Sequence, residues 1–198
     1  MIAEAFPSGS RHLVSAAQAR LEGGSHAPNG WIQRPERDPI RVNGEVLMIP
    51  ARQYDRPLDP SDLEPEARLL WLAWFTRSHD GRLRQMAIRE LPKHPDPWLL
   101  PYLIQPLGEY VIEITRDVRD LIGDALRDPK TAESLREFWL DNPTFVALTH
   151  SRARSYWHVY YRQEVPSYTG YPAAVALAEL DRNAARPTAL NRRCLCWG

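Results

Sequence analysis

The sequence predicts an all-α protein, built as a short α-solenoid of about three helix pairs. Three observations favour this fold class. Apolar residues recur at helical spacing from residue 66 onward, Asp-Pro or Asn-Pro dipeptides precede several of these stretches, and apolar positions repeat at a spacing of 31 residues. Helix pairs repeating at a period of roughly 20 to 50 residues are typical of α-solenoids. An ordinary helical bundle with coincidental spacing is the alternative.

Composition indicates a globular chain that needs no disulfide or metal to hold a core, since 43% of its 198 residues are hydrophobic and 25% are charged. Its 25 basic and 25 acidic residues cancel, so no global attraction to nucleic acid or to an anionic membrane is expected. No apolar run approaches the ~18 residues of a membrane span, and the first residues lack a secretory h-region. These features predict a cytoplasmic protein without membrane contact.

Residues 1–62 differ from the rest and are predicted to form an N-terminal extension. A short helix is expected before Gly23-Gly24, with an apolar face of Leu13, Val14, Ala17 and Leu21. Prolines are frequent from residue 28 to 60. Within that stretch IRVNGEVLMI predicts a β-hairpin, because Asn43-Gly44 suits a type I′ turn, whose two central residues need positive φ. An irregular arm lying on the helices is the alternative.

The helical domain is predicted over residues 63–181, with helix pairs at about 66–91, 97–126 and 129–163. Helix starts are expected at Asp96-Pro97, Asp128-Pro129 and Asn142-Pro143. An Asp or Asn side chain can accept hydrogen bonds from the free N–H groups of a first turn, and proline fits there because it has no N–H to leave unpaired.

Shifting the chain by 31 residues superposes apolar positions of the second helix in each pair. The matches are Leu83 with Ile114 and Phe145, Ala87 with Val118 and Thr149, and Leu91 with Ile122 and Ala153. This recurrence indicates stacked units rather than unrelated helices.

The residues that carry this repeat resemble the HEAT-repeat family. The resemblance rests on Asp80-Gly81-Arg82-Leu83-Arg84, on HPDPWLLPYLI and on LGEYVIEITRDVRDLI, and it covers residues 66–125 well and 129–163 weakly. It implies that the second helices line a concave face. Asp80 and Arg84 match the polar ladder of such repeats, whereas the second unit departs from it, with Glu109 in place of the Asp and Thr115 in place of the Arg.

The densest local signal lies in residues 151–171, which mix arginines with aromatic residues. Helical spacing divides them into an expected core stripe of Ala153, Tyr156, Trp157 and Tyr160 and a polar stripe of Arg154, His158, Tyr161 and Arg162. Such residues close the end of a solenoid, form protein-binding hot spots or stack nucleic-acid bases. All three interpretations stay open at this point.

Motifs for enzymatic chemistry are missing from the sequence. It contains no Gly-rich phosphate loop, no G-x-S-x-G, no H-E-x-x-H and no C-x-x-C, and the six histidines form no pair at ligand spacing. No cofactor and no metal is therefore predicted. Residues 182–198 are expected to be a basic C-terminal tail, in which Cys194 and Cys196 are reduced, because two cysteines make no disulfide framework. A soft-metal or redox role for this pair is the alternative, although no other cysteine is present to complete a metal site.

The leading hypothesis is a non-enzymatic protein-interaction module, because the polar faces of the second helices carry mixed charge, which suits a protein partner better than a phosphate backbone. The residues expected to bind that partner are Arg82, Gln85, Arg89, Arg116, Asp120, Arg154, His158, Tyr161 and Arg162.

The alternative is a nucleic-acid-binding protein, akin to the DNA glycosylases of HEAT-like shape. It requires a basic groove formed by Arg82, Arg84, Arg89, Arg116, Arg119, Arg152 and Arg154. An enzyme with a dispersed site is a third hypothesis, for which the spacing of acidic and basic residues selects no set.

Overall fold

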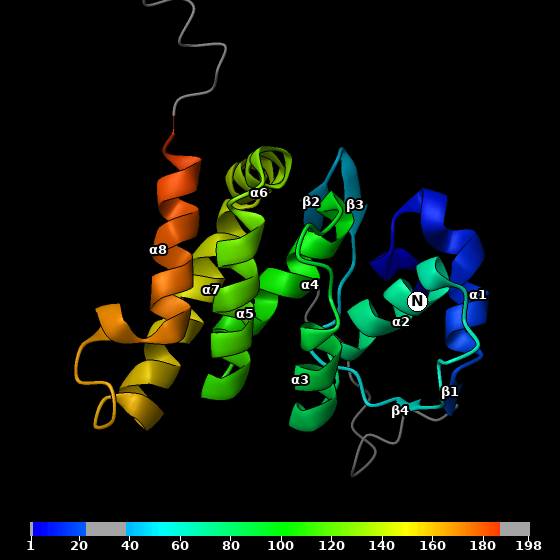
Figure 1. Ribbon diagram of the computed structural model, residues 1–198, viewed down its shortest axis with the longest axis horizontal. Helices are drawn as coiled ribbons and strands as arrows, with labels where there is room; N and C mark the ends of the chain where they lie inside the picture. Colours follow the sequence, from blue (N-terminus) through cyan, green and yellow to red (C-terminus); the bar gives the residue numbers. More distant parts are fainter. Residues whose placement is uncertain (1, 23–38, 187–198) are drawn as a thin grey trace, which may run out of the picture.

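The structure, a computed structural model, describes residues 2–22 and 39–186. Within these residues the fold is mostly α-helical, with two small two-stranded sheets, so the all-α class is confirmed at this coarse level. Figure 1 shows the longer helices side by side, from α8 at one end through α5 and α3 to α2 and α1 at the other.

The helices and strands have the following bounds. The α-helices are α1 (Arg11–Gln18), α2 (Pro65–Phe75), α3 (Gly81–Arg89), α4 (Leu100–Ile104), α5 (Ile112–Ala125), α6 (Pro129–Asp141), α7 (Pro143–Tyr156) and α8 (Pro172–Ala184). The strands are β1 (Leu21–Glu22), β2 (Ile40–Val42), β3 (Glu45–Leu47) and β4 (Arg56–Pro57). Short 3-10 turns are η1 (Ile2–Ala5), η2 (Ser8–Ser10), η3 (Pro97–Leu99), η4 (Gln105–Gly108) and η6 (Tyr168–Gly170), and η5 (Trp157–Tyr161) is a π-helical turn that continues α7.

The helices pack in an order that differs from their order in the chain. Helix α2 packs on α3, α3 packs on α5, and α5 makes its most extensive contact with α8 rather than with α7. Small buried residues of α8, such as Ala173 and Ala176, allow the close approach. Helix α7 packs instead on η4, where Gly108 leaves room for the side chain of Arg152. Helix α8 lies outside the three predicted helix pairs and ends at Ala184, past the expected domain boundary at residue 181.

Only part of the expected helix capping is present. The Asp128 carboxylate accepts hydrogen bonds from the Thr131 backbone N–H at 2.8 Å and from the Thr131 hydroxyl at 2.7 Å, as the Asp-Pro signal predicts. Asp96 makes no capping hydrogen bond, and neither does Asn142, so the prediction is wrong at those two positions.

Asn142 holds the β2–β3 ribbon against the helices instead of capping α7. Its Oδ1 accepts from the Arg41 backbone N–H at 2.7 Å, and its Nδ2 donates to the Arg41 carbonyl at 2.8 Å and to the Phe138 carbonyl at 2.8 Å. An amide side chain offers both a donor and an acceptor, so it matches the outward-facing N–H and C=O of one strand residue. This contact joins α6 to a strand about a hundred residues earlier.

Strands β2 and β3 pair antiparallel around Asn43-Gly44, with Ile40 opposite Leu47. Both turn residues have positive φ, 49° for Asn43 and 80° for Gly44, as a type I′ turn requires. The Ile40 and Leu47 side chains are buried in the main core. The ribbon is therefore part of the packed body.

The first residues of the N-terminal extension also belong to the main core. Phe6 is 1% exposed, and its ring stacks on Tyr102 at 5.8 Å and meets the edge of Trp98 at 6.0 Å. The Tyr102 hydroxyl donates a 2.5 Å hydrogen bond to the carbonyl of Ala5. The described part of the extension thus closes one end of the helical body and shares its core.

Candidate partner-binding surface

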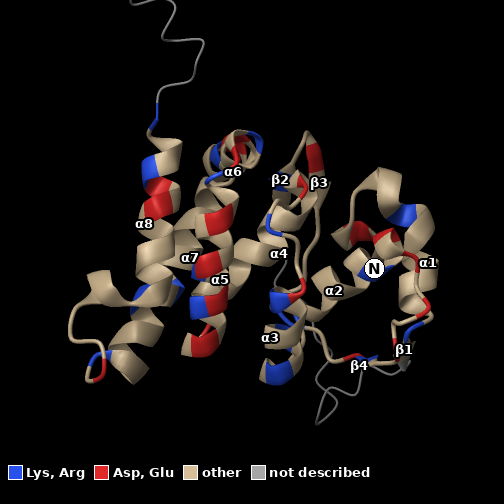
Figure 2. Cartoon of the chain, in the orientation of Figure 1, with Lys and Arg blue, Asp and Glu red and all other residues tan. Residues whose placement is uncertain are grey.

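The predicted strip on α3 and α5 is present at the surface, and its residues come close together. Arg82 and Gln85 line an open hollow of about 470 Å³ with Val111 and Glu113. Acidic and basic segments alternate along α5 in Figure 2. The strip therefore carries the mixed charge that the sequence indicates.

Only part of the charge on this strip is neutralised within the protein, because Arg89 and Asp120 form ion pairs whereas Arg82 and Arg116 take part in none of those between described residues. Asp117 accepts a hydrogen bond from Gln85 Nε2 at 2.7 Å and from Arg89 Nε at 2.9 Å, which ties α3 to α5. Asp120 pairs with Arg119 at 2.7 Å. Exposed ion pairs contribute roughly 0–1 kcal/mol each, so the Arg89–Asp117 pair is a weak link between α3 and α5, and the Arg119–Asp120 pair lies within α5. Gln85, Arg89 and Asp120 consequently offer a partner few unpaired groups.

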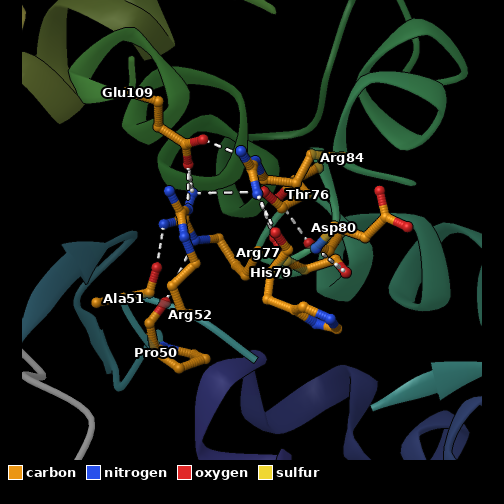
Figure 3. Close-up of polar contacts among 11 residues, drawn as sticks. Pro50, Ala51, Arg52, Thr76, Arg77, His79, Asp80, Arg84 and Glu109 are labelled. Atoms are coloured by element: carbon orange, nitrogen blue, oxygen red, sulfur yellow. Dashed lines mark hydrogen bonds and ion pairs between the residues drawn. The ribbon is translucent and has the colours of Figure 1, made fainter. Parts of the chain in front are cut away.

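A cluster of buried charges lies between the extension and the first two helix pairs (Figure 3). Glu109, 2% exposed, lies 3.1 Å from Arg77 Nη1 and 2.5 Å from Arg52 Nη1 through Oε1, and 2.7 Å from Arg84 Nε through Oε2. Three guanidinium groups thus share one carboxylate. The Arg77 and Arg84 side chains are almost entirely buried.

Backbone carbonyls accept from several of the remaining donors of this cluster, whereas Arg84 Nη2 is buried without a hydrogen-bond partner among the described residues. Arg77 donates to the carbonyls of Pro50 and Ala51, and Arg84 Nη1 donates to those of Ser78 at 2.7 Å and His79 at 3.0 Å. Burial lowers the pKa of Arg77 to about 10, an effect that the charge of Glu109 opposes, so Arg77 stays protonated at neutral pH. The cluster is a structural joint, because its buried groups are directed at the protein itself.

This joint changes two expectations from the sequence. Arg84 forms its ion pair with Glu109, whereas the Asp80 side chain caps α3 by accepting a hydrogen bond from the Arg82 backbone N–H at 2.8 Å. Arg84 is also 1% exposed, so its expected place in a nucleic-acid-binding groove is wrong.

Exposed aromatic rings gather where α7 ends. We call Tyr110, Tyr156 and Tyr160 the tyrosine cluster; their ring centroids lie between 6.1 and 6.3 Å apart. Tyr110 is 49% exposed and Tyr160 is 58% exposed, and Val159 in the same turn is 66% exposed. Exposed large apolar groups that pack on one another are typical of binding surfaces.

Hydrogen bonds inside the protein fix the π-helical turn that presents these rings. The Tyr161 hydroxyl donates to the Tyr110 carbonyl at 2.6 Å and accepts from the Ile112 backbone N–H at 3.3 Å. Trp157 Nε1 donates to the Val165 carbonyl at 2.8 Å. Desolvation by the surrounding protein raises the pKa of Tyr161. The turn is therefore anchored on both sides.

The π-helical turn reverses the sequence assignment of two neighbouring tyrosines. Helical spacing predicts Tyr160 in the core, but Tyr160 is exposed. The same spacing predicts Tyr161 at the partner surface, but the Tyr161 hydroxyl is directed inward at the backbone of α5. A π turn holds one more residue than an α turn, so it rotates the residues that follow relative to α-helical spacing. No helical pattern marks Tyr110, because it stands in the short connection between η4 and α5.

Three arginines and one histidine that are predicted to bind the partner lie exposed near this cluster: Arg116 on α5, Arg154 on α7, His158 in η5, and Arg162 just after η5. None of them takes part in any of the ion pairs formed among residues 2–22 and 39–186. The Arg154 guanidinium lies over the ring of Tyr168, 4.5 Å from its centroid. The end of α7 thus has cations that the described chain does not neutralise.

Tyr171 lies beneath this surface, fully buried against Tyr161 at 5.7 Å, and burial raises its pKa to about 12. The neutral hydroxyl is therefore favoured by folding. The resulting stabilisation is complete below about pH 10, the ordinary tyrosine pKa, and is lost as the pH rises toward 12. We expect Tyr171→Phe to reduce the fall in unfolding free energy over this window, measured by urea denaturation at pH 9 to 11.5.

The matched control is Tyr160→Phe, which removes the hydroxyl of an exposed tyrosine. In this variant the unfolding free energy should fall between pH 9 and 11.5 as much as it does in the parent protein. If the unfolding free energy of Tyr171→Phe falls over this pH range as much as that of the parent protein, the raised pKa of Tyr171 is not a cause of the loss of stability.

Metal and membrane sites do not appear in the part of the chain that the structure describes. Over residues 2–22 and 39–186, no group of three or more His, Cys, Asp or Glu side chains is placed to hold a metal ion. No described helix combines the length and the apolar character needed to cross a membrane. The two cysteines and the tail after residue 186 lie outside the described residues.

No protein-family model matches the chain, and neither the curated proteins nor the solved structures contain a match.

Proposed function

We propose that this protein is a non-enzymatic protein-interaction module that binds its partner through the tyrosine cluster and the cations around it. The observation that carries the proposal is the set of mutually packed rings of Tyr110, Tyr156 and Tyr160, of which Tyr110 and Tyr160 are exposed and Tyr156 is half-buried. Tyrosine and arginine are enriched at binding hot spots, and rings that are already ordered lose little conformational freedom when a partner binds.

The scaffold of this module is proposed to be a short HEAT-like α-solenoid, with α2–α3, α4–α5 and α6–α7 as its units. The packing of α3 on α5 supports a stacked arrangement. The Glu109 joint supports it as well, because it links the second unit to Arg77 and Arg84 of the first. In this arrangement α8 covers α5, and the end of α7 remains open for a partner.

Nucleic-acid binding receives less support. Of the arginines needed for a basic groove, Arg84 is buried and Arg89 and Arg119 lie in ion pairs with Asp117 and Asp120. Neutralised cations release no counterions from a phosphate backbone, so they add little affinity for it. A protein partner therefore fits the charge distribution better.

Affinity capture from an extract of the native cell, read out by quantitative mass spectrometry, tests the proposal. Truncating a hot-spot residue costs about 2 kcal/mol or more, so Tyr160→Ala should reduce partner recovery at least about tenfold. Tyr160 is preferable to Tyr161, whose hydroxyl bonds hold the fold. Val46→Ala, a truncation of another exposed apolar residue, is the control and should leave recovery intact. Equal recovery with Tyr160→Ala and the parent protein would remove the tyrosine cluster from the proposal.

A further inference from the structure

We infer that residues 187–198, which we call the tail segment, fold back and bind in a pocket between helix α6 and the β2–β3 ribbon of the same chain. This pocket is separate from the tyrosine cluster, so the inference goes beyond the proposed function and does not depend on it. Three features of the described residues support it: the lining of the pocket, its excess of negative charge, and the place where the tail segment leaves the body.

The first feature is the apolar part of the pocket lining. The pocket is open and has a volume of about 350 Å³, and Val42, Pro97, Phe138 and Leu140 contribute apolar side chains to it. Leu140 is 52% exposed, so a large apolar group of the lining stays in water among the described residues. Covering exposed apolar surface is favourable, and such surface is typical of docking sites.

The second feature is an excess of negative charge at the end of α6. Glu137 and Asp141 line the pocket, and neither forms an ion pair with a described residue. The last turn of α6 also contains no basic residue, although the C-terminal end of a helix carries partial negative charge that cations stabilise. Of the arginines in the lining, Arg136 pairs with Glu133 at 3.2 Å, which leaves only Arg41 to oppose the two acids. A basic segment therefore complements this part of the pocket.

The third feature is the point at which the tail segment begins. Arg186 is the residue directly before it, and the Arg186 carbonyl accepts a hydrogen bond at 3.3 Å from Nε of Arg136, which itself lines the pocket. Figure 1 shows the end of α8, helix α6 and the β2–β3 ribbon on the same side of the molecule. Six extended residues span roughly 20 Å, so the tail segment is long enough to cross a pocket of this size.

The composition of the tail segment matches the pocket. It contains Arg192 and Arg193 but no acidic residue, and its larger apolar residues are Leu190, Leu195 and Trp197. We expect the arginines to lie beside the two unpaired acids of α6, and an apolar side chain to cover the exposed leucine of the lining.

The covalent link to the body makes these contacts sufficient. Exposed ion pairs and one covered apolar side chain give little affinity between separate molecules, because association itself is costly. A segment joined to its site by a short connection has an effective concentration in the millimolar range, so contacts that are too weak to hold a free peptide can hold the segment. The tail segment is therefore expected to occupy the pocket in the intact chain.

Disulfide trapping in the full chain tests the inference, because Cys194 and Cys196 are its only cysteines. Leu140→Cys places a thiol in the pocket lining, and Val159→Cys places one at a more exposed apolar position after α7. After mild oxidation in a glutathione buffer, mass spectrometry measures the fraction of chains in which the new cysteine is joined to Cys194 or Cys196. We expect Leu140→Cys to cross-link at least tenfold faster than Val159→Cys, although fewer residues separate position 159 from the tail segment.

Charge variants of Leu140→Cys distinguish binding in the pocket from simple proximity. Adding Glu137→Lys or Asp141→Lys should slow the cross-linking at least fivefold, because each change removes an acid and repels the arginines of the tail segment. Adding Glu113→Lys, the same charge reversal at an exposed glutamate of α5, should leave the rate within twofold. If Leu140→Cys lowers the melting temperature, Ser134→Cys places the thiol elsewhere in the same lining and is expected to behave in the same way.

Three results would overturn the inference. The first is equal cross-linking of Leu140→Cys and Val159→Cys, and the second is a rate that Glu137→Lys and Asp141→Lys change no more than Glu113→Lys does. The third is a disulfide that joins two chains, seen as a dimer on a non-reducing gel, because the pocket then takes the tail segment of a second copy. None of these results affects the proposed function, which depends on partner recovery with Tyr160→Ala.

Discussion

Replacing Glu109 with alanine is expected to lower the free energy of unfolding by about 3–5 kcal/mol, the cost of removing one partner from a buried ion cluster. The carboxylate lies within 3.1 Å of the guanidinium groups of Arg52, Arg77 and Arg84. Its loss leaves Arg77 and Arg84 charged and buried without an acid. Urea denaturation followed by circular dichroism at pH 7 measures the effect.

Two comparisons make this experiment specific. Glu113→Ala removes an exposed carboxylate from the same region and should change stability by less than about 0.5 kcal/mol. Replacing Glu109 by leucine together with Arg77 and Arg84 by methionine removes the buried charges as a set, and should recover much of the loss. A Glu109→Ala variant as stable as Glu113→Ala would show that the cluster does not hold the two helix pairs together.

Replacing Phe6 with alanine is expected to cost about 3–5 kcal/mol, the range for truncating a fully buried aromatic side chain. Phe6 is 1% exposed and packs against Trp74, Trp98 and Tyr102. The cavity would open between the N-terminal extension and the helical body. Thermal and urea denaturation measure the effect, and tryptophan fluorescence should change as well, because Trp74 and Trp98 line the site of the cavity.

The control is Leu58→Ala, which truncates a side chain of the same extension that is 37% exposed. It should cost clearly less than Phe6→Ala, because more than a third of the Leu58 residue stays in water after folding whereas Phe6 is almost completely buried. If Phe6→Ala is as mild as Leu58→Ala, the extension is not part of the cooperative core, and the helical body folds without it.

Much of the helical domain follows from local sequence signals. The expected pairs at about 66–91, 97–126 and 129–163 each contain two helical segments, because apolar residues at helical spacing need only a neighbouring surface to become buried. Asp128 caps its helix because the donor lies three residues away on the same turn. Asn43-Gly44 has the positive φ values of its turn for an equally local reason.

The binding surface was only partly predictable. Arg154, His158 and Arg162 are exposed as expected, because charged side chains stay in water unless they are paired. The exchange of Tyr160 and Tyr161 was not predictable, since a single π turn rotates every later residue and leaves no clear mark in composition. Tyr110 joins the cluster only because η4 and α7 pack together.

The sequence by itself determined the elements whose causes lie within a few residues: the amphipathic helices, the Asp128 cap and the Asn43-Gly44 turn. The tertiary structure decided the contacts between residues far apart in the chain. Glu109 meets Arg52 and Arg77, Asn142 binds the backbone of Arg41, and Phe6 fills the core beside Tyr102. The physical reason is that hydrophobic burial is non-directional, so a pattern of apolar residues says which side chains leave water but not which partners they meet.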